Sequence, residues 1–284
     1  MITLNGTVIN PTLFPDATSQ VWHLPDNLLD PRKIGNRVAW RFKHEAELFH
    51  LHQLSCLLSK YCTCDHKLTL HMPYLPYARQ DKEVSNSASF ALTAFAEIIN
   101  SQLWSRVTAF DVHNPSETAK LIMGFENRLP NPPTDKYDVV VFPDKGAQER
   151  YANCTELPTV VGDKVRDQAT GWITDYIFDE DSVAGKRVLV WDDLCDGGAT
   201  FNVLGKSLGK AKMVDLYVSH GIFSKGIREL LKTYSRIITT DTCIEISLLN
   251  NRCWCNQSPK WRGMHDAYKT GKLRIQPHLW QGLS

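Results

Sequence analysis

The sequence lacks a strong charge bias, a long apolar run and any internal repeat. Its formal net charge is +1 over 284 residues, which excludes a broadly basic surface for nucleic acid or for a membrane. No apolar run approaches the length of a membrane span, and the first residues lack the basic and apolar segments of a signal peptide. We therefore expect a cytoplasmic protein without nucleic-acid or membrane partners, in which any bound anion is held by a local site.

The spacing that is typical of structural zinc sites is also missing. The eight cysteines include two C-x-C pairs, Cys62–Cys64 and Cys253–Cys255, but no C-x-x-C pair. His66 lies close to the first pair, which leaves a metal site there as the alternative. Nothing else indicates a secreted protein, and a chain of this length does not need disulfides. We expect reduced, structural thiols.

The sequence does contain a series of apolar, β-branched runs separated by helical stretches. Such a series favours an α/β fold with parallel sheets flanked by helices. The predicted strands are residues 67–72, 106–110, 138–142, 187–191, 213–218 and 236–239, and the predicted helices are 88–101, 201–208 and 225–233.

The prolines within residues 129–134 oppose both a helix and a central strand, so they predict a linker. We expect an N-terminal domain at residues 1–130 and a C-terminal domain at 135–250. Residues 251–284 show no strand pattern and are expected to pack back as an irregular tail.

The clearest motif follows the predicted strand at residues 187–191. Two adjacent carboxylates, Asp192 and Asp193, come directly after it, and a loop of small residues then leads into a helix. Glycines let main-chain N–H groups approach a phosphate, and a helix N-terminus favours its charge. Carboxylates suit sugar hydroxyls or a cation. The alternative is a simple N-cap by Asp196. The loop residues assigned to an acceptor phosphate are Asp196, Gly197, Gly198, Ala199 and Thr200.

This motif resembles the PRPP-binding motif that is shared by phosphoribosyltransferases and by the ribose-phosphate diphosphokinases (PRPP synthetases). The stretch Pro73–Lys82 separates the two classes, because it closely resembles the Pro-Tyr…Tyr-Ala-Arg-Gln-Asp signature of the synthetases. The resemblance implies that Arg79, Gln80 and Asp81 bind ATP. An arginine fork suits phosphate oxygens, and a glutamine amide suits an adenine edge.

Three further segments resemble synthetase elements. Residues 110–114 resemble an Asp-Leu-His segment, which implies that His113 helps to hold Mg²⁺ and ATP. Asp144 lies in a segment similar to Ser-Pro-Asp-x-Gly-Gly and is the second candidate ligand of the cation. Lys164 and Arg166 lie where the family's catalytic loop opens, which implies that they neutralise charge during diphosphoryl transfer.

A fourth segment, Arg41–Glu47, sits where the family contacts the nucleotide base. Phe42 fits as a stacking residue, whereas the acidic position remains open between Glu45 and Glu47. Taken together, the resemblance implies two type I phosphoribosyltransferase-like domains with the active site between them. It also implies Mg²⁺ as cofactor, ATP and a ribose-phosphate acceptor as substrates, and a homo-oligomer, either a dimer or a hexamer.

One departure bears on the acceptor. The family loop reads Asp-Thr-x-Gly-Thr, whereas Gly197 stands here in place of the threonine, which removes a phosphate ligand and opens space. The first expectation is ribose 5-phosphate as acceptor, giving PRPP and AMP for nucleotide biosynthesis. The alternative is ADP-ribose, whose product would feed NAD synthesis, as would suit a viral-type relative acting in host cytoplasm. A non-catalytic regulator is opposed by the intact Lys164, Arg166, Asp192 and Asp193, and a phosphoribosyltransferase by Tyr77–Asp81.

Overall fold

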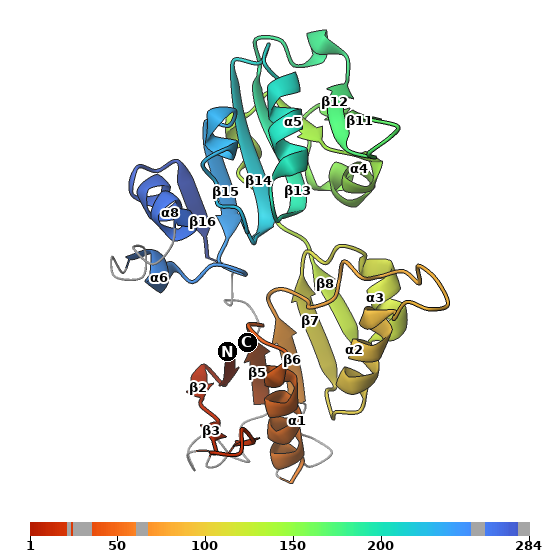
Figure 1. Cartoon of the computed structure of the whole chain (residues 1–284), viewed down its shortest axis with the longest axis vertical. Coiled ribbons are helices and arrows are strands. Elements are labelled where there is room, and N and C mark those ends of the chain that lie inside the picture. Colours follow the sequence, from red (N-terminus) through yellow and green to blue (C-terminus); the bar gives the residue numbers. More distant parts are fainter. Residues whose placement is uncertain (22–23, 25–35, 61–67, 251–258, 278–284) are drawn as a thin grey trace. The chain divides into compact units, whose positions relative to one another are not determined.

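A computed structural model describes residues 1–21, 24, 36–60, 68–250 and 259–277. The chain divides into two compact units, unit 1 from Met1 to Pro130 and unit 2 from Asn131 to Ser284 (Figure 1). Within the described ranges, no helix is both long and apolar enough to cross a membrane.

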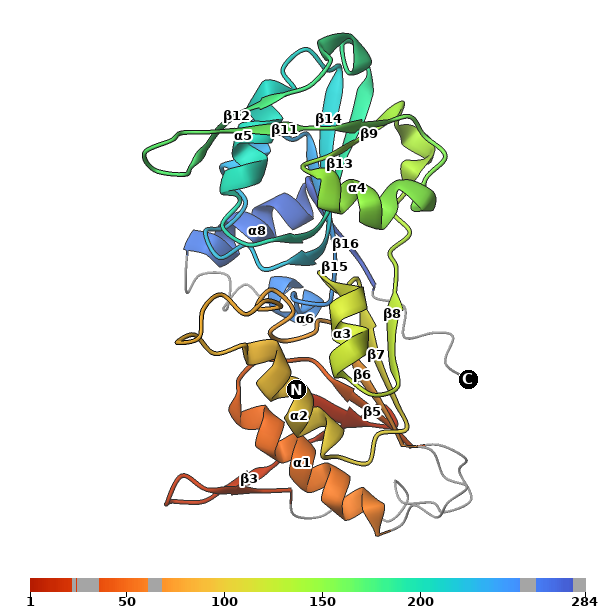
Figure 2. The ribbon, with the colours of Figure 1, turned by 90° about the vertical axis from the view of Figure 1, so that its right-hand side faces the viewer.

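Unit 1 is built on a six-stranded sheet in the order β2-β1-β5-β6-β7-β8. Strands β5 to β8 run parallel to one another, whereas β1 is antiparallel to both β2 and β5. The apolar sides of the first two helices pack on the sheet (Figure 2) and form one core with the apolar strand residues. The elements are β1 (Ile2–Leu4), β2 (Thr7–Ile9), β3 (Thr12–Leu13), β4 (Ser19–Gln20), β5 (Asn36–Trp40), α1 (Ala46–Ser59), β6 (Leu68–Met72), α2 (Ala91–Asn100), β7 (Arg106–Phe110), α3 (Pro115–Leu121) and β8 (Phe125–Arg128).

Unit 2 is built on a six-stranded, fully parallel sheet in the order β10-β9-β13-β14-β15-β16. Apolar side chains cover both of its faces, as expected for a parallel sheet. A separate antiparallel hairpin, β11–β12, follows β10. The elements are β9 (Val139–Phe142), α4 (Lys145–Tyr151), β10 (Thr159–Val161), β11 (Asp163–Arg166), β12 (Ile173–Ile177), β13 (Arg187–Cys195), α5 (Ala199–Ser207), β14 (Met213–Gly221), β15 (Arg236–Thr240), α6 (Ile246–Asn250), α8 (Pro259–Lys269) and β16 (Leu273–Gln276), with short 3-10 turns between several of them.

The expected α/β fold with parallel sheets flanked by helices is confirmed. Three details of the expectation are wrong. Strand β13 does not end at Trp191 but runs on to Cys195. Residues 225–233 form no continuous helix, because Gly226 takes a left-handed φ of 74° and only Leu230–Lys232 form a 3-10 turn.

The third error concerns the tail. Residues 259–276 are not an irregular appendage, because β16 adds a parallel strand to the sheet beside β15. Met264, Ala267 and Leu273 are buried in the unit 2 core. The two C-x-C pairs and His66 lie outside the described residues, and Cys56 and Cys195 are free thiols.

Candidate active site

In unit 1, the three segments that were expected to bind ATP follow three neighbouring parallel strands, β5, β6 and β7. Phe42 follows β5, and its ring lies edge-on to the ring of Tyr77, which follows β6, with 6.5 Å between centroids. The Tyr77 hydroxyl donates a hydrogen bond of 2.8 Å to Glu45 Oε1. Burial, and then Glu45, raise the pKa of Tyr77 to about 12, so the phenol stays protonated at neutral pH.

The third segment is joined to the second by a hydrogen bond. Asn114 Nδ2 donates to Asp81 Oδ2 at 2.8 Å, so the residue next to His113 holds the end of the Arg79–Asp81 stretch. The side chains of Arg79, Gln80 and His113 are exposed. The structure therefore brings these segments together at the carboxyl edge of the unit 1 sheet, where ligands of open α/β sheets bind.

The backbone at this edge is strained. Tyr77 and Asp111 take φ values of 64° and 45°, in the left-handed region that residues other than glycine rarely adopt. Asp111 is fully buried. Such strain persists only where the surroundings enforce it, and it gathers at ligand sites.

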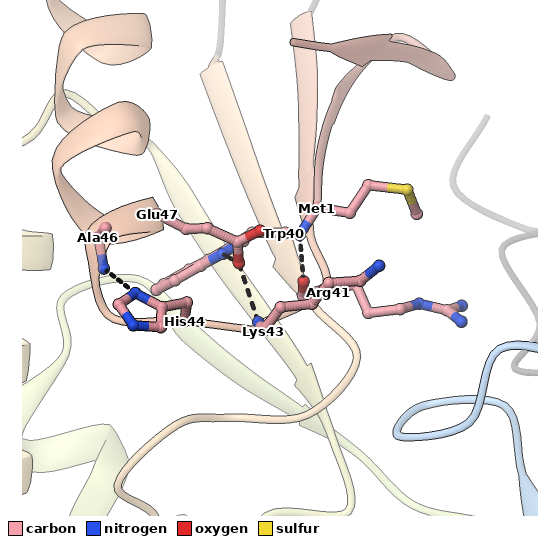
Figure 3. A network of polar contacts seen from close by, with 7 residues as sticks. All are labelled: Met1, Trp40, Arg41, Lys43, His44, Ala46 and Glu47. Carbon is pink, nitrogen blue, oxygen red and sulfur yellow. Dashed lines mark hydrogen bonds and ion pairs between the residues drawn. The ribbon is translucent and has the colours of Figure 1, made fainter. Parts of the chain in front are cut away.

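The two candidate acids of the fourth segment have different partners, and Figure 3 shows those of Glu47. Glu47 accepts hydrogen bonds from Trp40 Nε1 and Lys43 N, each at 2.9 Å, and pairs with the Met1 amine. Burial raises the pKa of Glu47, but these hydrogen bonds outweigh it, so the pKa is lowered. Glu47 is therefore a structural anchor, whereas the exposed Glu45 is the acid on the side of Phe42 and Tyr77.

In unit 2, Asp192 and Asp193 do not act as a matched pair. Both lie inside strand β13, where successive side chains point to opposite faces of the sheet. Asp193, 4% exposed, pairs with Arg150 of α4, with 3.2 Å between Oδ2 and Nη1. Asp193 N donates to Asp192 Oδ1 at 2.9 Å. The ion pair with Arg150 thus distinguishes Asp193 from Asp192.

Arg150 is a site residue that the sequence analysis missed. Its guanidinium is largely buried and lies 5.3 Å from the centre of the Tyr151 ring. Burial lowers the pKa of Arg150, but the Asp193 carboxylate outweighs this and raises it. Burial and then Asp193 raise the pKa of Asp192 well above the usual range.

Asp144 begins helix α4 and uses both of its carboxylate oxygens. Oδ1 accepts the Ala147 N–H at 2.9 Å, which makes Asp144 the N-cap, and Oδ2 lies 2.6 Å from Lys164 Nζ. Burial raises the pKa of Asp144, but Lys164 and the Ala147 N–H outweigh it and lower the pKa. The Asp144 carboxylate is therefore ionised and forms an ion pair with Lys164.

The two expected catalytic cations are not brought together. Both lie on β11 of the hairpin, but the register shifts between Val165 and Arg166, and this interrupts the alternation of side chains. Lys164 turns to Asp144, whereas Arg166 Nη1 donates to the Gly171 carbonyl at 3.1 Å.

Helix α5 begins without a side-chain cap. Its N-cap is Gly198, at a φ of 77°, which has no side chain to cap the first turn. Asp196 is therefore not the N-cap, which removes the alternative interpretation of the motif. The loop is held instead by its backbone, since Ser224 N donates to the Asp196 carbonyl at 3.2 Å. Unfilled N–H groups at a helix N-terminus attract an anion.

The oxygen-rich residues of unit 2 fit a magnesium ion only in part. Within the described residues, no three His, Cys, Asp or Glu side chains form a group that could hold a metal. His113 belongs to unit 1 and Asp144 to unit 2, and Asp144 is engaged by Lys164. Mg²⁺ usually takes only one or two carboxylates and completes its shell with water and substrate phosphates, so Asp192 suits this role.

The chain is related in sequence to ribose-phosphate pyrophosphokinases. No family model matches it. The relatives include those of Pyrococcus furiosus (29% identical over 62% of this chain and 67% of the relative), Corynebacterium efficiens (30%, 62% and 59%) and Thermococcus kodakarensis (30%, 62% and 66%). The chain thus spans about three fifths to two thirds of these relatives.

The fold is similar to that in the crystal structure of phosphoribosylpyrophosphate synthetase from Mycobacterium smegmatis. The TM-score is 0.61 over 81% of this chain and 73% of the other, at 19% identity. Together with the sequence relatives, this confirms the resemblance that the motifs indicated and the two-sheet α/β architecture.

Proposed function

We propose that this protein transfers the diphosphoryl group of ATP to the 1-hydroxyl of a ribose 5-phosphate-type acceptor, as its relationship to the ribose-phosphate pyrophosphokinases suggests. The observation that carries the proposal is the uncapped start of helix α5, which follows directly on the strand that bears Asp192. A phosphate at the helix N-terminus and a ribose on the neighbouring carboxylate would be bound by one continuous stretch of chain.

The step balances as follows. The acceptor's 1-oxygen forms a bond to the β-phosphorus, the bond from that phosphorus to the oxygen bridging the α- and β-phosphates breaks, and AMP leaves. The hydroxyl proton passes to solvent. Asp192 would accept hydrogen bonds from the ribose hydroxyls and hold the acceptor in place. When bound, Mg²⁺ would neutralise charge on the diphosphate.

The ATP side would be formed at the carboxyl edge of the unit 1 sheet. Phe42 supplies an aromatic face for the base, and Arg79 a planar cation for phosphate oxygens. Gln80, Asp81 and His113 complete the proposed nucleotide set, and the hydrogen bond from Asn114 to Asp81 fixes the segment that carries them.

Lys164 and Arg166 would neutralise the charge that develops on the transferring and leaving groups. For Lys164 to do so, its ammonium must exchange Asp144 for the substrate, because the two now form an ion pair. A half-exposed pair of this kind is weak enough for such an exchange, at about 0–1 kcal/mol.

A larger acceptor, such as ADP-ribose, is the second candidate, and Gly197 favours it. A Cβ built at Gly197 would meet the Lys225 side chain no closer than 3.6 Å, which is ordinary van der Waals contact, so glycine is not required there for packing. The space at Gly197 is therefore available to an acceptor with a bulkier 5′ substituent.

AMP release from Mg·ATP with ribose 5-phosphate or with ADP-ribose tests the proposed function. Activity with either acceptor supports diphosphoryl transfer, and the ratio of kcat/KM between them identifies the acceptor. A regulator would release no AMP with either one. Gly197→Thr should improve the use of ribose 5-phosphate by roughly tenfold to a hundredfold, since it adds a hydrogen bond to a charged group, and should impair ADP-ribose. An unchanged ratio would remove the support for the larger acceptor.

We also propose a cytoplasmic homo-oligomer. In unit 1, Phe49 and Ile98 are 60% and 41% exposed and line one pocket together with Leu48, and exposed apolar side chains that gather in this way favour a protein–protein contact. Sedimentation of the purified protein would give its size directly, and a monomer at micromolar concentration would contradict the proposal.

A further inference from the structure

A lysine that the motif analysis did not use lies against the acceptor loop. The Cδ and Cε atoms of Lys225 are each 3.6 Å from the position where a side chain at Gly197 would begin. One bond separates Cε from the ammonium nitrogen. The positive charge of Lys225 therefore lies beside the loop that leads into the uncapped helix α5.

The backbone holds Lys225 at this place. Ser224 N donates to the Asp196 carbonyl at 3.2 Å, and Phe223 N donates to the Cys195 carbonyl at 3.1 Å. Gly226, at a φ of 74°, then turns the chain away. The segment that carries Lys225 is thus tied to the end of β13, and a helix over 225–233 would not place the lysine in this way.

A second lysine braces the same segment from the other side. Lys260 of α8 is half-buried, and its Nζ donates to the Ile222 carbonyl at 3.0 Å. Burial lowers the pKa of Lys260, while the nearby Asp196 opposes this. The ammonium of Lys260 is therefore already hydrogen-bonded to the backbone. Lys225, in contrast, is exposed, and within the described part of the chain no side chain pairs with the Lys225 ammonium.

We propose that Lys225 is a binding residue for the 5′ phosphoryl end of the acceptor, where it supplies the charge that the side-chain-free Gly197 cannot. This inference rests on the proposed function and names the ligand chemistry of that site: a phosphate monoester or the diphosphate of a larger 5′ substituent. A lysine amine is a point charge on a flexible stem, so it can follow either one.

The test is a set of three variants. Lys225→Met keeps the stem and removes the charge, and Lys225→Arg keeps the charge. Lys206→Met is the matched control, because Lys206 is also exposed and lies in the last turn of the same helix α5. For each variant, acceptor KM is measured with both acceptors, and the dissociation constant of ribose 5-phosphate is measured by calorimetry at low and high salt.

Lys225→Met should weaken acceptor binding about tenfold or more and reduce its salt dependence, as expected for loss of a hydrogen bond to a charged group. Lys225→Arg should retain most of the binding, and Lys206→Met and the KM for ATP should be unchanged. Weaker binding of both acceptors would mean that Lys225 contacts the phosphate on the ribose 5′-oxygen. Weaker binding of ADP-ribose alone would mean that Lys225 contacts the second phosphate of its diphosphate.

The two proposals fail differently. An active wild type with an unimpaired Lys225→Met variant overturns the role of Lys225 and leaves the proposed function standing. A wild type that binds ribose 5-phosphate through Lys225 but releases no AMP overturns the proposed function and leaves the anion site standing. A wild type that neither binds nor reacts overturns both.

Discussion

Helices α4 and α5 begin after neighbouring strands of one parallel sheet, but only α4 has an N-cap residue whose side chain accepts a hydrogen bond from the first turn. At α4, the carboxylate of Asp144 accepts the Ala147 N–H and neutralises the helix end from within the chain. At α5, the N-cap is Gly198, which has no side chain to cap the turn. The helix dipole favours an anion at both places. The chain supplies that anion at α4, whereas at α5 the phosphate of the proposed acceptor would supply it.

The same contrast holds for charges on the strands. Asp193 is paired inside the protein with Arg150, whereas the pKa of its neighbour Asp192 is raised by burial and by Asp193. Asp144 and Asp193 thus stabilise the fold. Gly198 offers α5 no such side chain, and burial disfavours the charged form of Asp192, so both positions cost folding free energy. Such costs are common at sites that bind substrate.

Removing Arg150 should give the largest loss of stability. Arg150→Met leaves the buried Asp193 carboxylate without its cation, and breaking a buried ion pair on one side costs about 3–5 kcal/mol. Urea unfolding of the two proteins measures the difference. The double variant Arg150→Met with Asp193→Asn should recover much of it, because the orphaned charge is gone. A single variant as stable as wild type would mean that Asp193 is not a structural acid.

Lys164→Ala should lower kcat about a hundredfold, which corresponds to on the order of 3 kcal/mol of transition-state stabilisation, while ATP affinity changes little. Arg166→Ala should do the same if both cations reach the substrate. Lys145→Ala is the control, because Lys145 is exposed and adjoins the same Asp144. Near-normal turnover in either active-site variant would leave that residue without its proposed role.

Asp192→Asn should raise the stability of the protein at pH 7 and weaken acceptor binding. The folded-state pKa of Asp192 is raised above its unfolded value, so its contribution to stability is full at low pH and is lost as pH rises towards the folded pKa. At pH 7 the asparagine variant should therefore be more stable than wild type, and this gain should vanish in acid. The same change should raise the acceptor KM about tenfold or more.

Thermal unfolding from pH 3 to pH 8 and acceptor kinetics at pH 7 check both halves of this prediction. A variant that is less stable at pH 7 would contradict the raised pKa of Asp192, and a variant that retains normal acceptor KM while ATP affinity falls would place Asp192 outside the acceptor site.

The sequence indicated the sheets well, because runs such as Val139–Phe142 are apolar and β-branched and cannot be anything but buried strands in this pattern. It did not indicate that β13 continues through Asp192 and Asp193, since aspartate is depleted in strands. That error hid the difference between the two carboxylates, of which Asp193 pairs with the buried Arg150. The extent of the strand is decided by pairing with β14, which local propensity does not report.

Contacts that span long separations were also missed. Nothing in the local pattern around Arg150 shows that it meets Asp193, 43 residues later, because only the packing of α4 on the sheet creates the pair. Lys225 was assigned to a helix on the strength of the residues that follow it, but the backbone bonds from Phe223 and Ser224 to the end of β13 impose a loop. The site motifs could be named from sequence, whereas the partners of their charges could not.

The smallest expected effect concerns Asp144, which both caps helix α4 and pairs with Lys164. Asp144→Ala removes the N-cap of α4 and should cost about 1 kcal/mol of folding stability, while Asp144→Asn should cost little, because asparagine caps equally well. Both changes release Lys164, and the half-exposed pair adds at most about 1 kcal/mol. Chemical unfolding of both variants therefore shows whether the cap or the ion pair matters for the fold. Equal losses in Ala and Asn would make the ion pair the main contribution and would weaken the contrast with α5, since α4 would then keep its acid for Lys164 and not for its own N-terminus.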